Sequence, residues 1–124
     1  MKGKKSCWKI KIIESDANKL GEKFVSYEMI VGLQVKDDKL YSDYRHAMKP
    51  LLEKADGGFR YDFKVSEVLK NEEGRPINRV FAIYFGSKEQ SERFFSDPGY
   101  LEIKKQFFEA SVDHTTIISK YECS

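Results

Sequence analysis

Two histidines, His46 and His114, are the side chains of this sequence best suited to proton transfer near neutral pH. His46 falls in a predicted helix among polar neighbours, where an imidazole is expected to face solvent. His114 falls in a predicted strand, from which a side chain can reach a cavity and act as a general base. Asp113 precedes it, but adjacent strand residues point to opposite faces unless a bulge intervenes, so the two should not form a dyad. His114 is therefore the candidate base.

Metal and nucleotide chemistry find no support in the sequence. Neither the two histidines nor the two cysteines occur at a spacing typical of a zinc or haem site. The sequence also contains no GxSxG elbow, no phosphate loop and no dinucleotide fingerprint. We therefore predict a protein that uses no metal ion and no cofactor.

Six elements must position any site. The stretch from Tyr41 to Tyr100 has the pattern of helix, strand, hairpin, strand and helix. One strand precedes it, within 24–35, and another follows at about 112–121. The order βαββαβ predicts an α+β fold, in which two helices cover one face of a four-stranded antiparallel sheet. Any function should then lie on the helix-free face.

Local signals predict where the first helix begins, bends and ends. Asp37 is expected to cap it, and Gly57 with Gly58 to end it. Pro50 lies inside the pattern and predicts a bend or an irregular last turn. The apolar face is expected to consist of Leu40, Tyr44, Ala47, Met48 and Leu51.

The second helix is expected to be broken. Ser87 and Gln90 form a capping box at its start. The residues 96–98, Ser-Asp-Pro, should interrupt it and cap a further segment that runs to Phe108.

Strand alternation assigns residues to the helix-free face. On the first strand the odd-numbered apolar residues are expected to face the helices, and on the second strand Phe59, Tyr61, Phe63 and Val65 form the apolar side. The predicted helix-free face then displays Glu28, Ile30, Gly32, Gln34, Arg60, Asp62, Lys64, Ser66, Ala82 and Tyr84. The charged residues of the second strand form a solvated edge that resists aggregation, the rim of a cavity, or ion pairs between subunits.

Length and charge limit the domain organisation and the partners. The 124 residues predict a ferredoxin-like α+β domain over 24–124, with an N-terminal extension, 1–23, that carries an extra strand. The net charge of +2, with both signs interspersed, argues against a nucleic-acid partner. No apolar run approaches the roughly 20 residues of a membrane span, and no signal peptide is evident. A cytoplasmic location without membrane association is expected.

An open sheet of this kind could instead bind RNA, as RNA-recognition motifs do. The segment RVFAIYF at 79–85 has a faint likeness to the central-strand motif of that family. Stacking on bases needs aromatic rings from the two central strands, but the corresponding positions hold Ile30 and Ile83, and Val80 replaces the usual glycine. An RNA-binding module is therefore an alternative with little support.

A closer resemblance covers about 31–122. The segments YSDYRHAMKPLLEKADGGFR, RVFAIYFGSKEQSERFFSDPGY and KKQFFEASVDHTTIISKYE resemble the family catalogued as domain of unknown function thirteen-thirty, in the dimeric α+β barrel superfamily. Its most specific pieces are the two helix tyrosines Tyr41 and Tyr44 ahead of Pro50 and Leu51, the stop at Gly57 and Gly58, and the helix break at Asp97, Pro98 and Tyr100. Tyr84 stands where that family often carries an acidic residue.

The resemblance implies a homodimer in which two sheets meet face to face as a dimeric α/β barrel, with a cavity between the sheet and the helices or between the sheets. Its superfamily includes cofactor-independent monooxygenases, dehydratases and isomerases. We therefore expect a protein that binds a small organic molecule, with a cofactor-independent enzyme, a purely structural dimer and the RNA-binding module as alternatives. Any catalysis would be proton abstraction by His114, with Tyr84 as hydrogen-bond donor and Arg60 holding an anion. Asp62, Glu28 and Gln34 are the further candidates for ligand binding.

Overall fold

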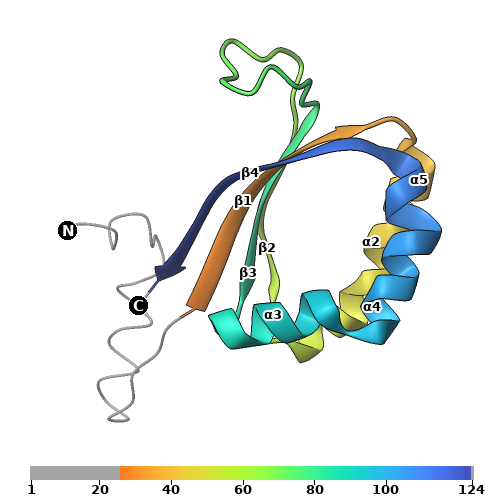
Figure 1. The fold of residues 1–124 in the computed structure, drawn as a ribbon, viewed down its shortest axis with the longest axis vertical. Helices are drawn as coiled ribbons and strands as arrows, with labels where there is room; N and C mark the ends of the chain where they lie inside the picture. The colour runs from red at the N-terminus through yellow and green to blue at the C-terminus, as the bar shows by residue number, and fades with distance from the viewer. Residues whose placement is uncertain (1–25, 124) are drawn as a thin grey trace.

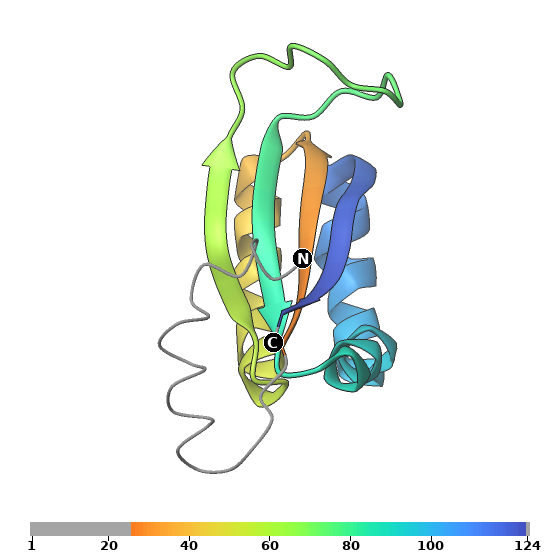
Figure 2. The ribbon, with the colours of Figure 1, turned by 90° about the vertical axis from the view of Figure 1, so that its left-hand side faces the viewer.

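The computed structural model describes residues 26–123, and the strand predicted within 1–23 lies outside them. The elements are β1 (Ser26–Val35), α2 (Asp38–Lys54), β2 (Gly58–Lys64), β3 (Arg79–Phe85), α3 (Lys88–Ser96), α4 (Pro98–Ile103), the π-helical η2 (Lys104–Phe108), α5 (Glu109–Ser111) and β4 (Val112–Cys123). Figure 1 shows the sheet and the helices as two layers, and Figure 2 shows the four strands side by side in front of the helices. The α+β fold predicted from the sequence is confirmed.

The strands form one antiparallel sheet in the order β2-β3-β1-β4. β1 and β3 are central, and their helix-facing residues include Leu33, Phe81 and Phe85, which are fully or nearly buried. The predicted alternation on β1 and β3 is therefore confirmed. The core lies between this face and the helices.

The helix α2 begins and ends through local hydrogen bonds. The carboxylate of Asp37 accepts a hydrogen bond from the backbone of Leu40 at 3.0 Å, which confirms the predicted cap. The helix runs through Pro50 without interruption. Its buried face consists of Tyr41, Tyr44, Met48 and Leu52, one position round from the face predicted with Leu40, Ala47 and Leu51.

The end of α2 uses an aspartate where the sequence suggested glycine. Asp56 adopts the left-handed conformation with φ 55°, and the amide of Gly57 donates to the carbonyl of Leu52 at 2.9 Å. These are the features of a Schellman motif. Gly57 is needed for a different reason, because a Cβ atom there would lie 2.5 Å from the carbonyl oxygen of Tyr84. The helix therefore ends just before the two glycines, as predicted, but the left-handed residue is Asp56 rather than a glycine.

A bulge in β2 changes which of its residues face the helices. Phe59 pairs with Ile83 and Tyr61 with Ala82, so Arg60 is the extra residue between them. One inserted residue moves every later side chain to the opposite face. Asp62, opposite Phe81, therefore lies on the helix-covered side, while Tyr61 and Phe63 lie on the helix-free side. The predicted placement of Asp62 and Lys64 on the helix-free face was wrong.

The second predicted helix is broken, as expected from the sequence, and it contains one feature that was not predicted. The Ser87 hydroxyl caps α3, and the Asp97 carboxylate caps α4 by accepting from the amide of Tyr100 at 3.0 Å. The chain then widens into a π-helical turn, in which the amide of Glu109 donates to the carbonyl of Lys104. π-Helical turns are rare in proteins, and those that occur are often found at functional sites.

Candidate functional site

Three of the sequence-predicted site residues meet on the helix-free face. The carboxylate of Glu28 accepts from the Nε of Arg60 at 2.7 Å and from the hydroxyl of Tyr121 at 3.1 Å. The Arg60 guanidinium lies 3.9 Å from the centre of the Tyr84 ring. Both charged side chains are buried, with 2% of Glu28 and 8% of Arg60 exposed. Tyr121 was not singled out from the sequence, because the bulges in β4 obscure its alternation.

This cluster has the properties of a closed ion pair. Burial, followed by the adjacent charge of Glu28, raises the pKa of the Tyr121 hydroxyl to about 12, so it remains a hydrogen-bond donor at neutral pH. Glu28 receives donors on both oxygens. The cluster can therefore hold the three strands β2, β1 and β4 together without any ligand.

His114 and Gln34 lie at the other end of the same face. They oppose each other across β1 and β4, and His114 is exposed. Gln34 is six positions along β1 from Glu28, which corresponds to about 20 Å. Tyr84 lies opposite Glu28. Within one chain, the structure does not bring His114 together with Tyr84 and Arg60. Asp113 forms an ion pair with Lys36 at 3.3 Å, away from His114.

Asp62 takes part in a different cluster on the helix-covered side. Its carboxylate accepts from Arg79 at 2.8 Å and from Arg45 at 3.1 Å. Burial alone would raise the pKa of this carboxyl, but the hydrogen bonds and charges of Arg79 and Arg45 outweigh it and hold the pKa below its ordinary value. The Nε of Arg45 also donates to the hydroxyl of Tyr41 at 2.8 Å. The cluster therefore fixes the orientation of Tyr41.

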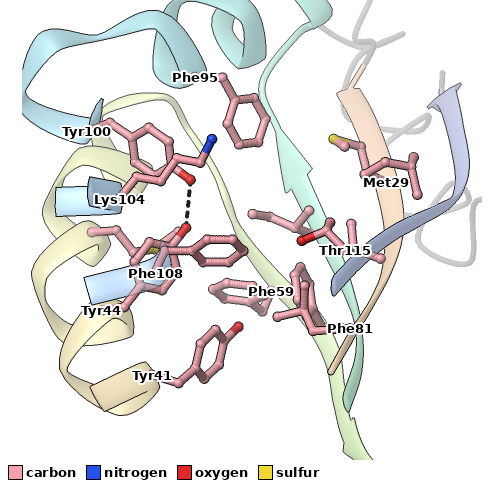
Figure 3. A pocket seen from close by; sticks show the side chains of 15 residues that line it. Met29, Tyr41, Tyr44, Phe59, Phe81, Phe95, Tyr100, Lys104, Phe108 and Thr115 are labelled. Carbon is pink, nitrogen blue, oxygen red and sulfur yellow. Dashed lines mark hydrogen bonds between the residues drawn. The ribbon is translucent and has the colours of Figure 1, made fainter. Parts of the chain in front are cut away.

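Tyr41 lines a cavity of about 370 Å³ that lies between the sheet and the helices. Figure 3 shows its side chains converging from both layers. Thr115 and Ile117 of β4, both exposed, mark the place where it reaches the surface. Seven of the lining side chains are aromatic. The lining consists of Met29, Val31, Leu33, Tyr41, Tyr44, Met48, Phe59, Phe81, Ile83, Phe95, Tyr100, Lys104, Phe108, Thr115 and Ile117.

The polar groups of the cavity come from the helices. The hydroxyls of Tyr44 and Tyr100 lie 2.7 Å apart and share one hydrogen bond, drawn as the dashed line in Figure 3. Burial raises the pKa of both, and the neighbouring Tyr100 raises that of Tyr44 further. Burial also raises the pKa of Tyr41, against the opposing charge of Arg45. All three hydroxyls are therefore neutral donors at physiological pH.

The raised pKa of the tyrosines predicts a loss of stability in alkali. Below about pH 10 each tyrosine is protonated in both the folded and the unfolded chain. Above that pH the tyrosines of the unfolded chain ionise first. At pH 11, each tyrosine that stays fully protonated in the folded chain therefore lowers the free energy of unfolding by roughly 1.4 kcal/mol. We expect Tyr44→Phe to lose less stability than the unchanged protein between pH 8 and pH 11 in urea unfolding. Equal losses in both proteins would contradict this account.

Lys104 is the one charged residue among the described residues that line the cavity. It follows Tyr100 by four positions and precedes Phe108 by four, so the three residues share one helix face. In Figure 3 the side chains of Tyr100 and Lys104 extend from the helices toward the sheet. The family resemblance left open a cavity at this place, between the sheet and the helices, but the site residues chosen from the sequence were assigned to the opposite face. The spacing Tyr100, Lys104, Phe108 was the available signal. Within 26–123 no group of three or more His, Cys, Asp or Glu side chains could hold a metal ion.

The fold defines the class of protein. A four-stranded antiparallel sheet with helices on one face is a ferredoxin-like α+β fold, and solved structures of the same fold match most of the chain. A protein of unknown function from Rhodopseudomonas palustris is 17% identical, with a TM-score of 0.67 over 87% of this chain and 90% of that chain. A dabb family protein with a ferredoxin-like fold from Mesorhizobium loti is 8% identical, with a TM-score of 0.53 over 81% and 96%. Hydroxynitrile lyase from Passiflora edulis is 18% identical, with a TM-score of 0.54 over 80% and 94%.

The chain belongs to the family described as domain of unknown function (DUF1330), whose model matches residues 27–121. This confirms the family inferred from the sequence segments. A search of curated proteins gave no match. No helix within 26–123 is long and apolar enough to cross a membrane.

Proposed function

We propose that this protein binds a small, mainly aromatic organic molecule in the cavity between the sheet and the helices. The observation that carries the proposal is the cavity itself. Its volume of about 370 Å³ falls within the usual range for small-molecule sites, roughly 300–1,000 Å³. An apolar lining with a few convergent polar groups is also typical of such sites.

The seven aromatic side chains favour a planar apolar ligand. Rings pack edge to face or offset at centroid distances of roughly 4.5–7 Å. The lining already contains such a pair, Phe59 and Phe81, at 5.3 Å and 80°. The ligand's ring would extend this arrangement across the cavity, and apolar burial would supply most of its affinity.

Two matched variants test this site with 2-naphthol as the probe. Ile117 lines the cavity and is 43% exposed, while the adjacent Ile118 is 52% exposed and does not line it. A tryptophan at 117 should fill the mouth. We expect the unchanged protein and Ile118→Trp to bind 2-naphthol in calorimetric titration, and Ile117→Trp to bind at least about tenfold more weakly. Equal binding by both variants, or no binding by the unchanged protein, would contradict the proposed site.

We also propose that the helix-free face packs against a second copy of the chain. The β2 bulge turns Tyr61 and Phe63 toward this face, where they are 48% and 54% exposed, with parallel rings 5.8 Å apart. Ile30 and Val80 add apolar surface to the same face. The resemblance to dimeric α+β barrels agrees with a dimer made through these sheets.

The mass in solution tests the dimer. Each chain has a mass of 14.5 kDa, so two chains give 29 kDa. Light scattering at low micromolar concentration should give about that larger value, and Phe63→Glu should lower it toward one chain. A monomer in the unchanged protein would contradict the dimer. It would favour the alternative in which Tyr61 and Phe63 stack on the bases of single-stranded RNA.

Catalysis would need more than the cavity. The fold similarity to hydroxynitrile lyase is compatible with an enzyme, but His114 and Tyr84 lie about 20 Å apart within one chain. A catalytic role for them therefore requires the second copy to bring one of them near the other. If the cavity alone binds the ligand, His114→Ala and Tyr84→Phe should leave the affinity for 2-naphthol unchanged.

A further inference from the structure

We propose that the ligand of this cavity is an aromatic carboxylate, whose negative group binds Lys104 and the tyrosine hydroxyls while its ring packs among the aromatic side chains. This inference rests on the proposed function and specifies the chemical class of its ligand. It follows from the donors, the charges and the arrangement of the lining residues.

The cavity offers more hydrogen-bond donors than acceptors. Tyr44 and Tyr100 have two hydroxyl protons between them, and the hydrogen bond that they share uses one. The hydroxyl of Tyr41 accepts from Arg45, so its own proton is also available. Among residues 26–123 these two protons have no acceptor. Buried donors of this kind favour a ligand that brings acceptors.

The charge of the lining is positive. Among the described residues, Lys104 is the one charged residue in contact with the cavity, and it is half-buried. Within the same residues its ammonium group forms no ion pair or hydrogen bond. Arg45 and Arg79 lie behind Tyr41, and among the described residues Asp62 is the one carboxylate paired with them. Two arginines and one aspartate leave that cluster with an excess of one positive charge. Within 26–123 no Asp or Glu lines the cavity, so an anion meets no repulsion from the described lining residues.

The position of Lys104 fits one end of an elongated ligand. It lies one helical turn from Tyr100, whose hydroxyl contacts that of Tyr44. The two oxygens of a carboxylate can therefore accept from the ammonium group and from a tyrosine hydroxyl at once. The π-helical turn spans Lys104–Phe108, and both of these end residues line the cavity. A ligand in the cavity can therefore contact the Lys104 cation and the Phe108 ring at the same time.

Paired probes of the same shape test the charge. 2-Naphthoate carries the carboxylate, and 2-naphthamide replaces it with a neutral group of similar size. Hydrogen bonds to ionised groups are strong enough to give a preference of about tenfold or more. We expect the unchanged protein to bind the naphthoate at least about tenfold more tightly in calorimetric titration at neutral pH.

Variants at two neighbouring lysines locate the effect. Lys104→Met should bring the affinities for the two probes to within about twofold, and Lys104→Arg should retain most of the preference. Lys105, which is exposed and does not line the cavity, provides the control: Lys105→Met should behave as the unchanged protein.

The outcomes separate the two proposals. If both probes bind equally to the unchanged protein, the carboxylate inference is overturned while the cavity remains a binding site. A preference for naphthoate that survives Lys104→Met also overturns the inference. Failure of both probes to bind would overturn the proposed function itself.

Discussion

Replacing Arg60 by alanine is expected to lower the free energy of unfolding by about 3–5 kcal/mol, because it leaves the Glu28 carboxylate buried without its counter-charge. The two side chains are 8% and 2% exposed, and the Nε of Arg60 lies 2.7 Å from the carboxylate of Glu28. Loss of an ion pair at this depth costs far more than loss of one at the surface. Urea unfolding at neutral pH and fixed protein concentration measures the difference.

Two further variants give this prediction its controls. Lys64 forms an ion pair with Asp38 in which the side chains are 74% and 68% exposed, so Lys64→Ala should change stability by no more than about 1 kcal/mol. The double variant Glu28→Gln with Arg60→Met removes both charges and should be more stable than Arg60→Ala alone. If the Arg60→Ala protein were as stable as the Lys64→Ala protein, the buried Glu28 carboxylate would not depend on the charge of Arg60, and the prediction would be wrong.

Replacing Gly57 by alanine is expected to cost about 2–3 kcal/mol, because the added Cβ has no space. It would lie 2.5 Å from the backbone oxygen of Tyr84 and 2.7 Å from the Cδ1 of Leu52. The first of these atoms belongs to the central strand β3 and can move only if the sheet moves. Thermal or urea unfolding of the variant measures the cost.

Gly74 separates crowding from backbone conformation. It has φ of +72°, and a Cβ there would meet no atom within 4 Å. Gly74→Ala should therefore cost about 1–2 kcal/mol, from the left-handed conformation alone. If Gly57→Ala were the less destabilising of the two, the close approach to β3 of the turn that follows α2 would be contradicted.

Features that depend on a few neighbouring residues were predictable from the sequence. Asp37, Ser87 and Asp97 each accept a hydrogen bond from a backbone amide three residues later, so their caps are visible in a short stretch of chain. The order of strands and helices follows from hydrophobic periodicity over longer stretches. The α+β fold of residues 26–123 was therefore predicted correctly.

The faces of β2 were not predictable, because a single extra residue reverses them. Arg60 has no sequence signal that marks it as a bulge, and its insertion moves Asp62 to the helices and Tyr61 and Phe63 away from them. The same effect hid Tyr121, since β4 has two shifts of register. Alternation is a reliable guide only while the register is unbroken.

The family resemblance implied a cavity between the sheet and the helices or between the sheets, but the residues themselves do not show whether one exists. The sequence shows that apolar side chains such as Phe59, Phe81 and Phe108 belong between the sheet and the helices, but not whether they fill that space. Whether a cavity remains depends on volumes and on the exact path of the helices. The π-helical turn at 104–108, which widens that path, has no recognised sequence signal here.

NMR of the methionine methyl groups during titration with 2-naphthoate can show whether a ligand binds between the sheet and the helices. Met29 of β1 and Met48 of α2 line the cavity from its two layers, and Met→Leu variants assign their signals. We predict that both methyl signals move as the ligand binds, because its aromatic ring lies between them. Binding that leaves both signals unmoved would place the ligand elsewhere and contradict the account.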